Sequence, residues 1–164
     1  MKKSDQGFNP KRFQVIVRTL IFIFHDDKIL LLKGAPNKKI WPGKFNGIGG
    51  HLEMNEDVLS SAKRELKEET GLTNINLQLR GNIVIDNGDQ TGIMLFVYRG
   101  EALSTKIVNS DEGQLMWVEM EELDKIDLVE DLKTLIPRVI SNEQSVFSGY
   151  YHFVNDKLQM EFEN

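Results

Sequence analysis

The chain has 164 residues, enough for one domain with a buried core, and its 40% hydrophobic and 27% charged residues are typical of a globular protein. Its net charge of −5 argues against a broad basic surface for duplex nucleic acid, and the absence of cysteine excludes disulfides and thiol catalysis. No signal peptide is evident, and the apolar run 13–24 contains Arg18 and is too short to span a membrane. We therefore expect a cytoplasmic protein without membrane partners.

In chain order, the polar residues 1–11 are expected to be flexible and to precede a single domain over 12–140. Two β-rich runs at 13–24 and 28–33 flank turn residues and predict a hairpin. A loop rich in glycine and proline follows. The remaining predicted elements of the domain are a helix after residue 55, strands at 75–86, 91–99 and 114–118, a short helical turn at 119–126 and a helix at 128–140.

The C-terminal segment 141–164 is predicted to form a β-hairpin around Asn155-Asp156. We expect it either to pack on the same domain or to contribute to a dimer interface, so the protein is expected to be a monomer or a homodimer. Strands that alternate with two helices predict the α/β class, as an α/β/α sandwich with a mixed β-sheet.

The helix after residue 55 carries an unusual acidic face. Asn55 or Asp57 can cap its N-terminus and Gly71 its C-terminus. Its glutamates lie three and four residues apart and therefore share one face: Glu65, Glu68 and Glu69. Such crowded carboxylates repel each other unless a cation lies among them. Mg²⁺ prefers oxygen ligands and is commonly bound by a few carboxylates together with substrate phosphates, so the pattern indicates a magnesium site for a phosphorylated substrate.

The alternative is a solvated amphipathic helix held by intrahelical ion pairs. The acidic face has Arg64 as its obvious local partner, and the glycines that precede the helix also need an explanation. Glycines in the segment 41–53 allow the backbone to approach a ligand closely, and a loop carbonyl there could supply a further oxygen ligand. A glycine-rich loop taken alone is more often only a tight turn.

The segment 50–72 resembles the Nudix box, a motif of nine specified positions. The matching residues are Gly50, Glu56, Arg64, Glu65, Leu66, Glu68, Glu69, Gly71 and Leu72. The preceding run, Phe45 to Glu53, resembles the approach to the box in the MutT-like branch of that family, which includes 8-oxo-dGTP diphosphatases. The resemblance covers roughly 12–140 and implies the same α/β/α fold.

The resemblance implies a hydrolase that breaks a P–O–P bridge, with Mg²⁺ as cofactor and Mn²⁺ as a substitute. The metal set would be Glu65, Glu68 and Glu69 with the Gly49 carbonyl, and Glu65 would also orient or deprotonate the water. Arg64 would steer the glutamates by charge-assisted hydrogen bonds, and Glu56 would be secondary. A further metal-binding or catalytic acid is expected at Glu112, because an E-G-Q run stands at a similar place in the MutT-like branch; the alternative is a polar turn residue.

Four further residues are candidates for binding the substrate. Lys33 ends a strand and could meet a phosphate, although such lysines are often only solvated. Asn46 can donate and accept hydrogen bonds and is the candidate base reader. Glu130 and Asp131 stand where relatives read the purine edge, with an exposed acidic helix start as the alternative.

The sequence therefore predicts a Mg²⁺-dependent pyrophosphohydrolase that cleaves a small-molecule nucleotide, a nucleoside triphosphate such as 8-oxo-dGTP or dGTP, to the monophosphate and pyrophosphate. One alternative keeps the chemistry and changes the substrate to ADP-ribose, a dinucleoside polyphosphate or a pterin triphosphate. Another is a nucleotide-sensing module without turnover, against which the full set of glutamates argues.

Overall fold

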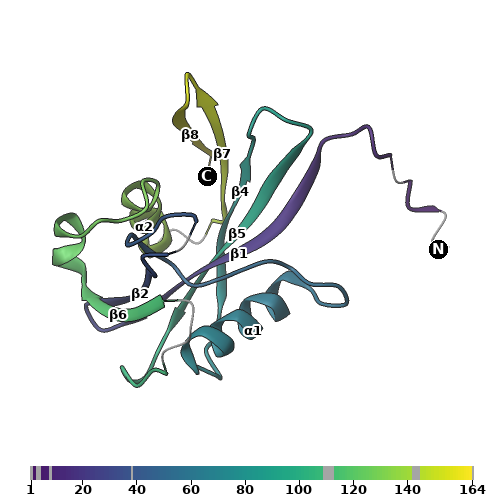
Figure 1. Ribbon diagram of the computed structural model, residues 1–164. Coiled ribbons are helices and arrows are strands. Elements are labelled where there is room, and N and C mark those ends of the chain that lie inside the picture. The colour runs from purple at the N-terminus through teal and green to yellow at the C-terminus, as the bar shows by residue number, and fades with distance from the viewer. Residues whose placement is uncertain are drawn as a thin grey trace.

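The computed structural model describes residues 2, 5–7, 9–37, 39–108, 113–141 and 145–163. These residues form one mixed β-sheet with a helix on each side (Figure 1). The strands are β1 (Gln14–His25), β2 (Lys28–Gly34), β3 (Phe45–Asn46), β4 (Gln78–Ile85), β5 (Thr91–Glu101), β6 (Gly113–Glu119), β7 (Phe147–Val154) and β8 (Lys157–Glu163). The helices are α1 (Val58–Thr70), the 3-10 helix η2 (Met120–Lys125) and α2 (Leu132–Ile140).

Within the described residues the strand order is β3-β2-β1-β5-β4-β7-β8, and β6 lies off this path and pairs with β2 along its whole length. The β1–β5 and β4–β7 pairs are parallel and the others are antiparallel. The predicted mixed sheet of an α/β/α sandwich is therefore confirmed.

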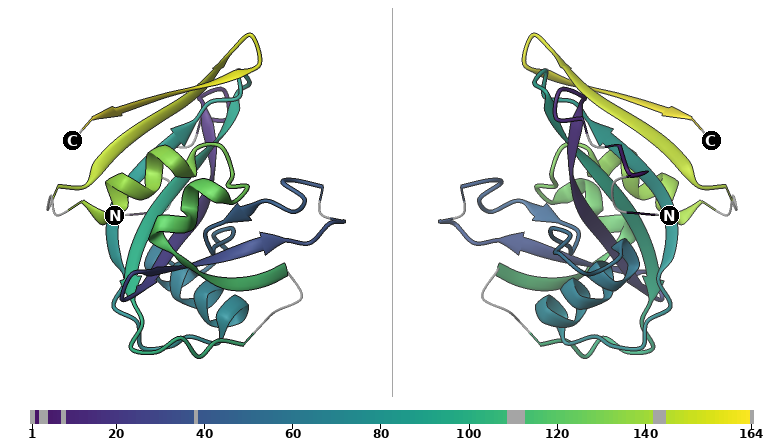
Figure 2. Two further views of the ribbon diagram at one scale, coloured as in Figure 1. Left: turned by 90° about the vertical axis from the view of Figure 1, so that its left-hand side faces the viewer. Right: turned by 90° about the vertical axis from the view of Figure 1, so that its right-hand side faces the viewer.

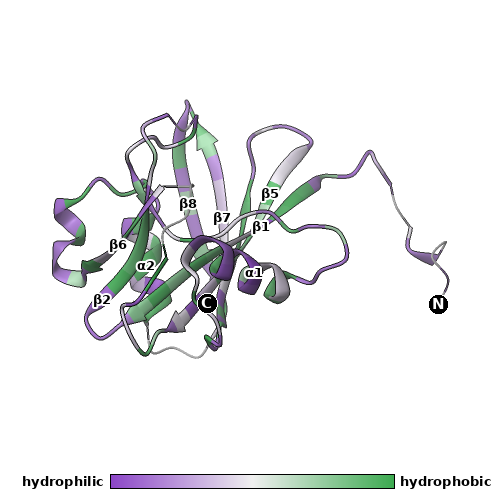
Figure 3. Ribbon diagram, turned by 60° about the horizontal axis from the view of Figure 1, so that its bottom comes forward, coloured by the Kyte–Doolittle hydropathy of each residue, from purple (hydrophilic) through white to green (hydrophobic). Residues whose placement is uncertain are grey.

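The apolar run in β1 is continuous because both faces of this strand are buried. On one face, Ile21 and Ile23 pack with Ala62 and Leu66 of α1. Figure 3 shows the contrast between the hydrophobic residues of the central strands and the hydrophilic residues over much of α1. The apolar stripe of α1 thus packs on the sheet. The acidic face of the helix is turned away from this packed stripe.

The opposite face of β1 packs against α2. Phe22 and Phe24 join Leu132, Leu135 and Val139 in a second buried cluster. Each large apolar side chain that leaves water in this way contributes about 1.5–3 kcal/mol, so the two clusters hold the three layers together.

The glycine-rich loop lies along β1 because β2 diverges from it. β1 and β2 pair only close to their connecting turn. Farther along β1, the N–H groups of Thr19 and Ile21 donate to the carbonyls of Gly50 and Ile48, at 2.9 and 2.7 Å. The loop thus takes the position of a strand and is held at the start of α1.

The boundaries of α1 follow its predicted caps. The Asp57 carboxylate accepts hydrogen bonds from the N–H groups of Leu59 and Ser60, at 2.9 and 3.0 Å. Gly71 has φ of 73° and donates its N–H to the Lys67 carbonyl at 2.9 Å. Both caps satisfy backbone groups that a helix end leaves unpaired, so the helix presents its side chains in a fixed register.

The C-terminal hairpin continues the main sheet. β7 pairs with β4 and β8 pairs with β7, and Figure 2 shows the two strands extending beyond the rest of the molecule. The predicted C-terminal β-hairpin is confirmed. No helix in the described part of the chain is both long and apolar enough to cross a membrane.

One local prediction differs from the structure, and one short strand was not predicted. The helix predicted at 128–140 begins only at Leu132, because the preceding segment pairs with β3. The Phe45 N–H donates to the Asp127 carbonyl at 2.8 Å, and the Val129 N–H donates to the Phe45 carbonyl at 2.9 Å. The two-residue strand β3 was not predicted, since nothing in its local sequence indicates this long-range pairing.

Candidate functional site

A cavity of about 660 Å³ opens beside α1, within the size range of small-molecule sites. It lies where β2 diverges from β1, and the glycine-rich loop crosses it. Its lining residues are Arg18, Leu32, Gly34, Lys39, Ile40, Trp41, Lys44, Asn46, Gly47, Gly49, Gly50, His51, Glu53, Glu65, Glu68 and Glu69. Four of the residues predicted to bind metal are therefore among those lining one cavity: Gly49, Glu65, Glu68 and Glu69.

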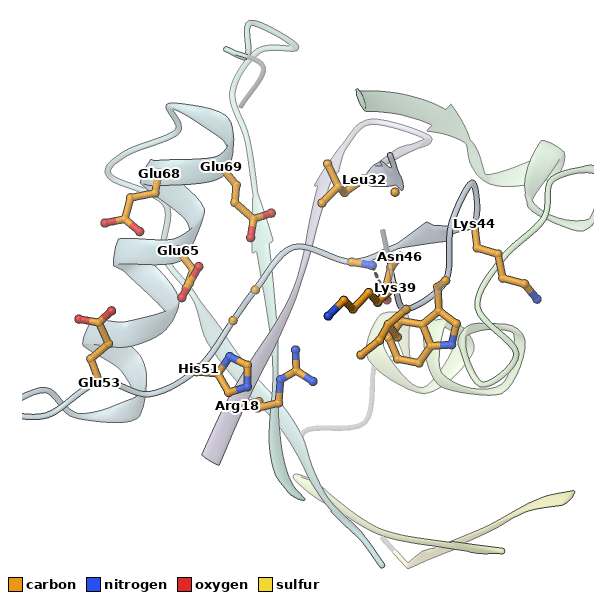
Figure 4. A pocket seen from close by; sticks show the side chains of 16 residues that line it. Arg18, Leu32, Lys39, Lys44, Asn46, His51, Glu53, Glu65, Glu68 and Glu69 are labelled. Atoms are coloured by element: carbon orange, nitrogen blue, oxygen red, sulfur yellow. Dashed lines mark hydrogen bonds between the residues drawn. The ribbon is translucent and has the colours of Figure 1, made fainter. Parts of the chain in front are cut away.

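The acidic wall of the cavity comes from α1. Figure 4 shows Glu65, Glu68 and Glu69 together on this helix. The side chain of Glu65 is 15% exposed and that of Glu68 59% exposed, whereas Glu69 as a whole is 7% exposed. The three carboxylates thus span the cavity from its solvent side to a buried position, and a buried carboxylate is costly unless other groups compensate its charge.

Arg64 joins the acidic wall to the loop before the helix. Its guanidinium donates to Glu65 Oε1 at 2.9 Å and to Glu68 Oε2 at 3.2 Å. It also donates to both oxygens of Glu56, at 2.7 and 3.1 Å, and to the His51 carbonyl at 3.1 Å. One cation therefore orients two of the three wall carboxylates and fixes them relative to the loop.

The charges in this network reinforce one another. The Arg64 guanidinium, with a smaller contribution from the Glu53 N–H, lowers the pKa of Glu56 from its ordinary 4.5 to about 2. Its hydrogen bonds with Glu56 in turn raise the pKa of Arg64. Glu56 therefore stays ionised at neutral pH and anchors Arg64.

Two glycines bring the loop against its neighbours. A Cβ at Gly50 would lie 2.3 Å from Glu65 Oε1, so the Glu65 carboxylate occupies the space that a side chain at 50 would fill. A Cβ at Gly49 would lie 2.2 Å from the Thr19 carbonyl oxygen, and Gly49 has φ of 143°. Only glycine adopts that backbone region readily, so position 49 shapes the loop while position 50 makes room for a carboxylate.

The opposite wall of the cavity carries amide and cationic groups. Figure 4 shows Lys39 and Asn46 across from the glutamates, with Arg18 and His51 between the two walls. The Asn46 Oδ1 accepts the N–H of Gly47 at 2.8 Å. Its amide NH₂ has no part in this hydrogen bond and is the donor that Asn46 can offer to a ligand.

Three of the predicted substrate residues do not line the cavity. The Lys33 ammonium lies 5.4 Å from the centre of the Phe45 ring, because Lys33 projects from the opposite face of β2. Glu130 is exposed in the turn before α2. Asp131 lies at the start of α2, where burial, the larger effect, raises its pKa and the Tyr151 hydroxyl beside it lowers it. Glu112 lies outside the described residues.

Sequence reasoning overlooked eight residues that line the cavity: Arg18, Leu32, Gly34, Lys39, Ile40, Trp41, Lys44 and Glu53. A signal for part of this group was present, because Pro-Gly at 42–43 favours a tight turn that can present its neighbours. No local signal indicated that this loop would line the same cavity as the glutamates of α1.

Comparisons with known proteins show to which family this chain is similar. A family model of the NUDIX domain matches residues 15–139. The oxidized purine nucleoside triphosphate hydrolase of Danio rerio is 28% identical over 136 residues, 82% of this chain and 85% of that protein. The Nudix hydrolase YvcI of Bacillus subtilis is 33% identical over 108 residues, 63% of this chain and 65% of its own length.

The structure of a MutT protein from Bacillus halodurans matches with a TM-score of 0.76 and 25% identity, and the match covers 91% of this chain and 98% of that one. The family match includes α1 with its acidic wall and ends before β7 and β8. This protein belongs to the Nudix family and is a MutT-like Nudix hydrolase.

Proposed function

We propose that this protein is a Mg²⁺-dependent pyrophosphohydrolase that cleaves a purine nucleoside triphosphate to the monophosphate and pyrophosphate. The main support is the acidic wall, where Glu65, Glu68 and Glu69 of one helix line a cavity that also holds amide and cationic groups. The relative from Danio rerio is named for hydrolysis of oxidized purine nucleoside triphosphates, which supports this substrate class.

The residues present fit a hard divalent cation. Carboxylates, together with a backbone carbonyl at Gly49, are the oxygen ligands that Mg²⁺ prefers, with Mn²⁺ as a substitute. Within the described residues, no three acidic or histidine side chains are grouped around one point as they stand. Glu65 and Glu68 each give a single oxygen to Arg64, so both can turn their carboxylates toward an ion at the shared helix face.

The ion, when bound, would neutralise phosphate charge and lower the pKa of a water molecule. The side chains of the protein would position the reacting groups and supply a polar environment for them. We assign Glu65, whose carboxylate lies against Gly50, to orient or deprotonate the attacking water. Arg64 is a positioning residue that holds the carboxylates of Glu65 and Glu68 in place relative to each other. Glu112 stays a candidate for the further acid of the reaction.

Lys33, Glu130 and Asp131 remain predicted substrate residues, but their positions outside the cavity give them no support here. We also propose that the domain extends over 12–140 and that 141–164 is an extension of it. A cytoplasmic location and a monomeric or homodimeric state stay predictions.

The direct test is hydrolysis of a nucleotide panel with Mg²⁺ or Mn²⁺, each repeated with EDTA. The panel holds 8-oxo-dGTP, the ordinary NTPs and dNTPs, ADP-ribose and a dinucleoside tetraphosphate. We expect metal-dependent release of pyrophosphate from purine triphosphates, abolished by EDTA, while circular dichroism shows that the chelated protein stays folded. Preference for ADP-ribose or the dinucleotide would keep the chemistry and reject the substrate; no turnover on any member would reject the proposed reaction.

Asn46→Asp is expected to change base preference. Aspartate keeps an oxygen for the Gly47 N–H and loses the amide donor, so one hydrogen bond to the base is removed with the local backbone retained. We expect the ratio of kcat/KM for guanine and adenine triphosphates to change by about tenfold. Asn155→Asp, the same change in the β7–β8 turn, is the control. Equal relative rates in Asn46→Asp and the parent protein would remove Asn46 as a base reader.

A further inference from the structure

Trp41 is an unusually exposed aromatic residue at the mouth of the cavity. Its side chain and that of the neighbouring Ile40 both line the cavity, yet Trp41 is 46% exposed and Ile40 is 63% exposed. Large apolar side chains that lie exposed together at a cavity lip would be stabilised if their apolar surface were removed from water. A ligand that covered the lip would gain this burial.

The backbone around Trp41 is firmly held. The Lys44 N–H donates to the Trp41 carbonyl at 3.2 Å, with Pro42 and Gly43 between them. Gly43 has φ of 74°, and proline followed by glycine at these positions is typical of a type II turn. The base of the loop is closed by two further bonds, from the Gly43 N–H to the Gly34 carbonyl and from the Gly34 N–H to the Lys44 carbonyl, each at 3.0 Å.

Trp41 itself adopts a conformation that bulky residues rarely take. Its φ is 52°, in the left-handed region, and it directly precedes a proline, which restricts its backbone further. Such a conformation persists when the surrounding structure enforces it. The turn therefore holds the indole at the lip in a strained backbone conformation. Burial of the indole does little to offset this strain, because the side chain stays largely exposed.

The charges of the cavity indicate which end of a nucleotide meets this lip. The glutamates lie on the α1 wall, where a metal-bound phosphate chain belongs. Arg18 and Lys39 line the cavity without an ion pair to any described acidic residue, whereas Lys44 lies 3.6 Å from Asp127. Leu32 adds a further apolar surface to the cavity. Arg18, which lies between the two walls, suits the phosphates, and this leaves the apolar lip for the planar base.

We propose that Trp41 is the stacking surface for the nucleobase of the substrate. Every base has a flat π-face, so stacking on an indole contributes affinity with little dependence on base identity. Discrimination between bases would then come from the Asn46 amide. The inference rests on the proposed function, because it assumes a nucleotide in this cavity.

The kinetic test compares Trp41→Ala and Trp41→Phe with the parent protein on the triphosphate that it hydrolyses best. We expect Trp41→Ala to raise KM about tenfold, within the range found for base–aromatic stacking, with kcat changed by less than about threefold. Trp41→Phe keeps a ring and should stay within about threefold of the parent KM. Phe153→Ala removes an aromatic residue of similar exposure (49%) from β7 and should leave both constants unchanged.

A binding test does not depend on turnover. The chain contains two tryptophans, so the fluorescence of the parent protein minus that of Trp41→Phe, which retains Trp117, reports Trp41. We expect dGMP to quench this difference signal and 2-deoxyribose 5-phosphate, which has no base, to leave it unchanged.

The outcomes separate this inference from the proposed function. Hydrolysis of triphosphates with an unchanged KM in Trp41→Ala and no quenching by dGMP would overturn the stacking role and leave the proposed function standing. Quenching by dGMP without hydrolysis of any triphosphate would support the stacking role and reject the proposed reaction. Equal quenching by dGMP and by the base-free sugar phosphate would overturn the stacking role, because the signal would then report phosphate binding alone.

Discussion

Glu69→Gln is expected to reduce kcat by about 10³-fold, because the variant removes a charge from the most buried position of the acidic wall. Glutamine has nearly the same shape, so packing around position 69 is preserved. The substitution also lowers the repulsion among three carboxylates on one helix face. The melting temperature should therefore stay equal to that of the parent protein or rise, while turnover collapses.

The measurement is kcat at saturating Mg²⁺, together with a thermal melt of each protein. Glu121→Gln, which removes an exposed carboxylate from η2, is the matched control and should leave kcat within about twofold. If Glu69→Gln turned over at a near-normal rate with Mg²⁺ in excess, Glu69 would have no place in the metal set.

Gly50→Ala is expected to reduce turnover by about 10²-fold without unfolding the protein. The new methyl group would take the space of the Glu65 carboxylate, whose atoms lie 2.3 to 2.7 Å from the position that this methyl would occupy. A carboxylate at the end of a flexible side chain can move away at low cost, but a displacement of about 1 Å at a reacting group can cost about 10²-fold in rate. Stability should be unchanged or slightly higher, since alanine restricts the unfolded chain.

Kinetics and thermal melts of Gly50→Ala and Gly7→Ala make the comparison, because a Cβ at Gly7 meets no atom within 4 Å. Gly49→Ala is unsuitable as a control, since its Cβ would collide with backbone that cannot move aside. Full activity in Gly50→Ala would mean that the position of the Glu65 carboxylate against the loop is irrelevant to the reaction.

Much of the fold could be predicted because its signals are local. Asp57 and Gly71 cap α1 as residue type and position indicate, and the turn residues Asn155 and Asp156 mark the C-terminal hairpin. The start of α2 could not be predicted, because Leu128 pairs with Phe45, far away in the sequence. Helix propensity favoured a longer helix, and this tertiary pairing overrode it.

The candidate site also has a part that could be predicted from local sequence and a part that could not. Helical spacing alone brings Glu65, Glu68 and Glu69 to one face, so their grouping could be predicted without a structure. Residues on different elements meet only through the fold. Lys33 was expected near the loop, but strand alternation directs it away from the cavity that its neighbours Leu32 and Gly34 line. Trp41 reaches that cavity through a turn whose anchors lie on β2.

The anchoring of Arg64 bears on the order in which the chain can fold and bind an ion. Glu56 and the His51 carbonyl hold the guanidinium independently of Glu65 and Glu68. The acidic wall thus has a counter-ion within the chain, and the position of this counter-ion does not depend on Glu65 and Glu68. On the proposed function, a newly synthesised chain would therefore be able to fold in a metal-poor environment and bind its ion afterwards, because Arg64 already supplies positive charge to the acidic wall.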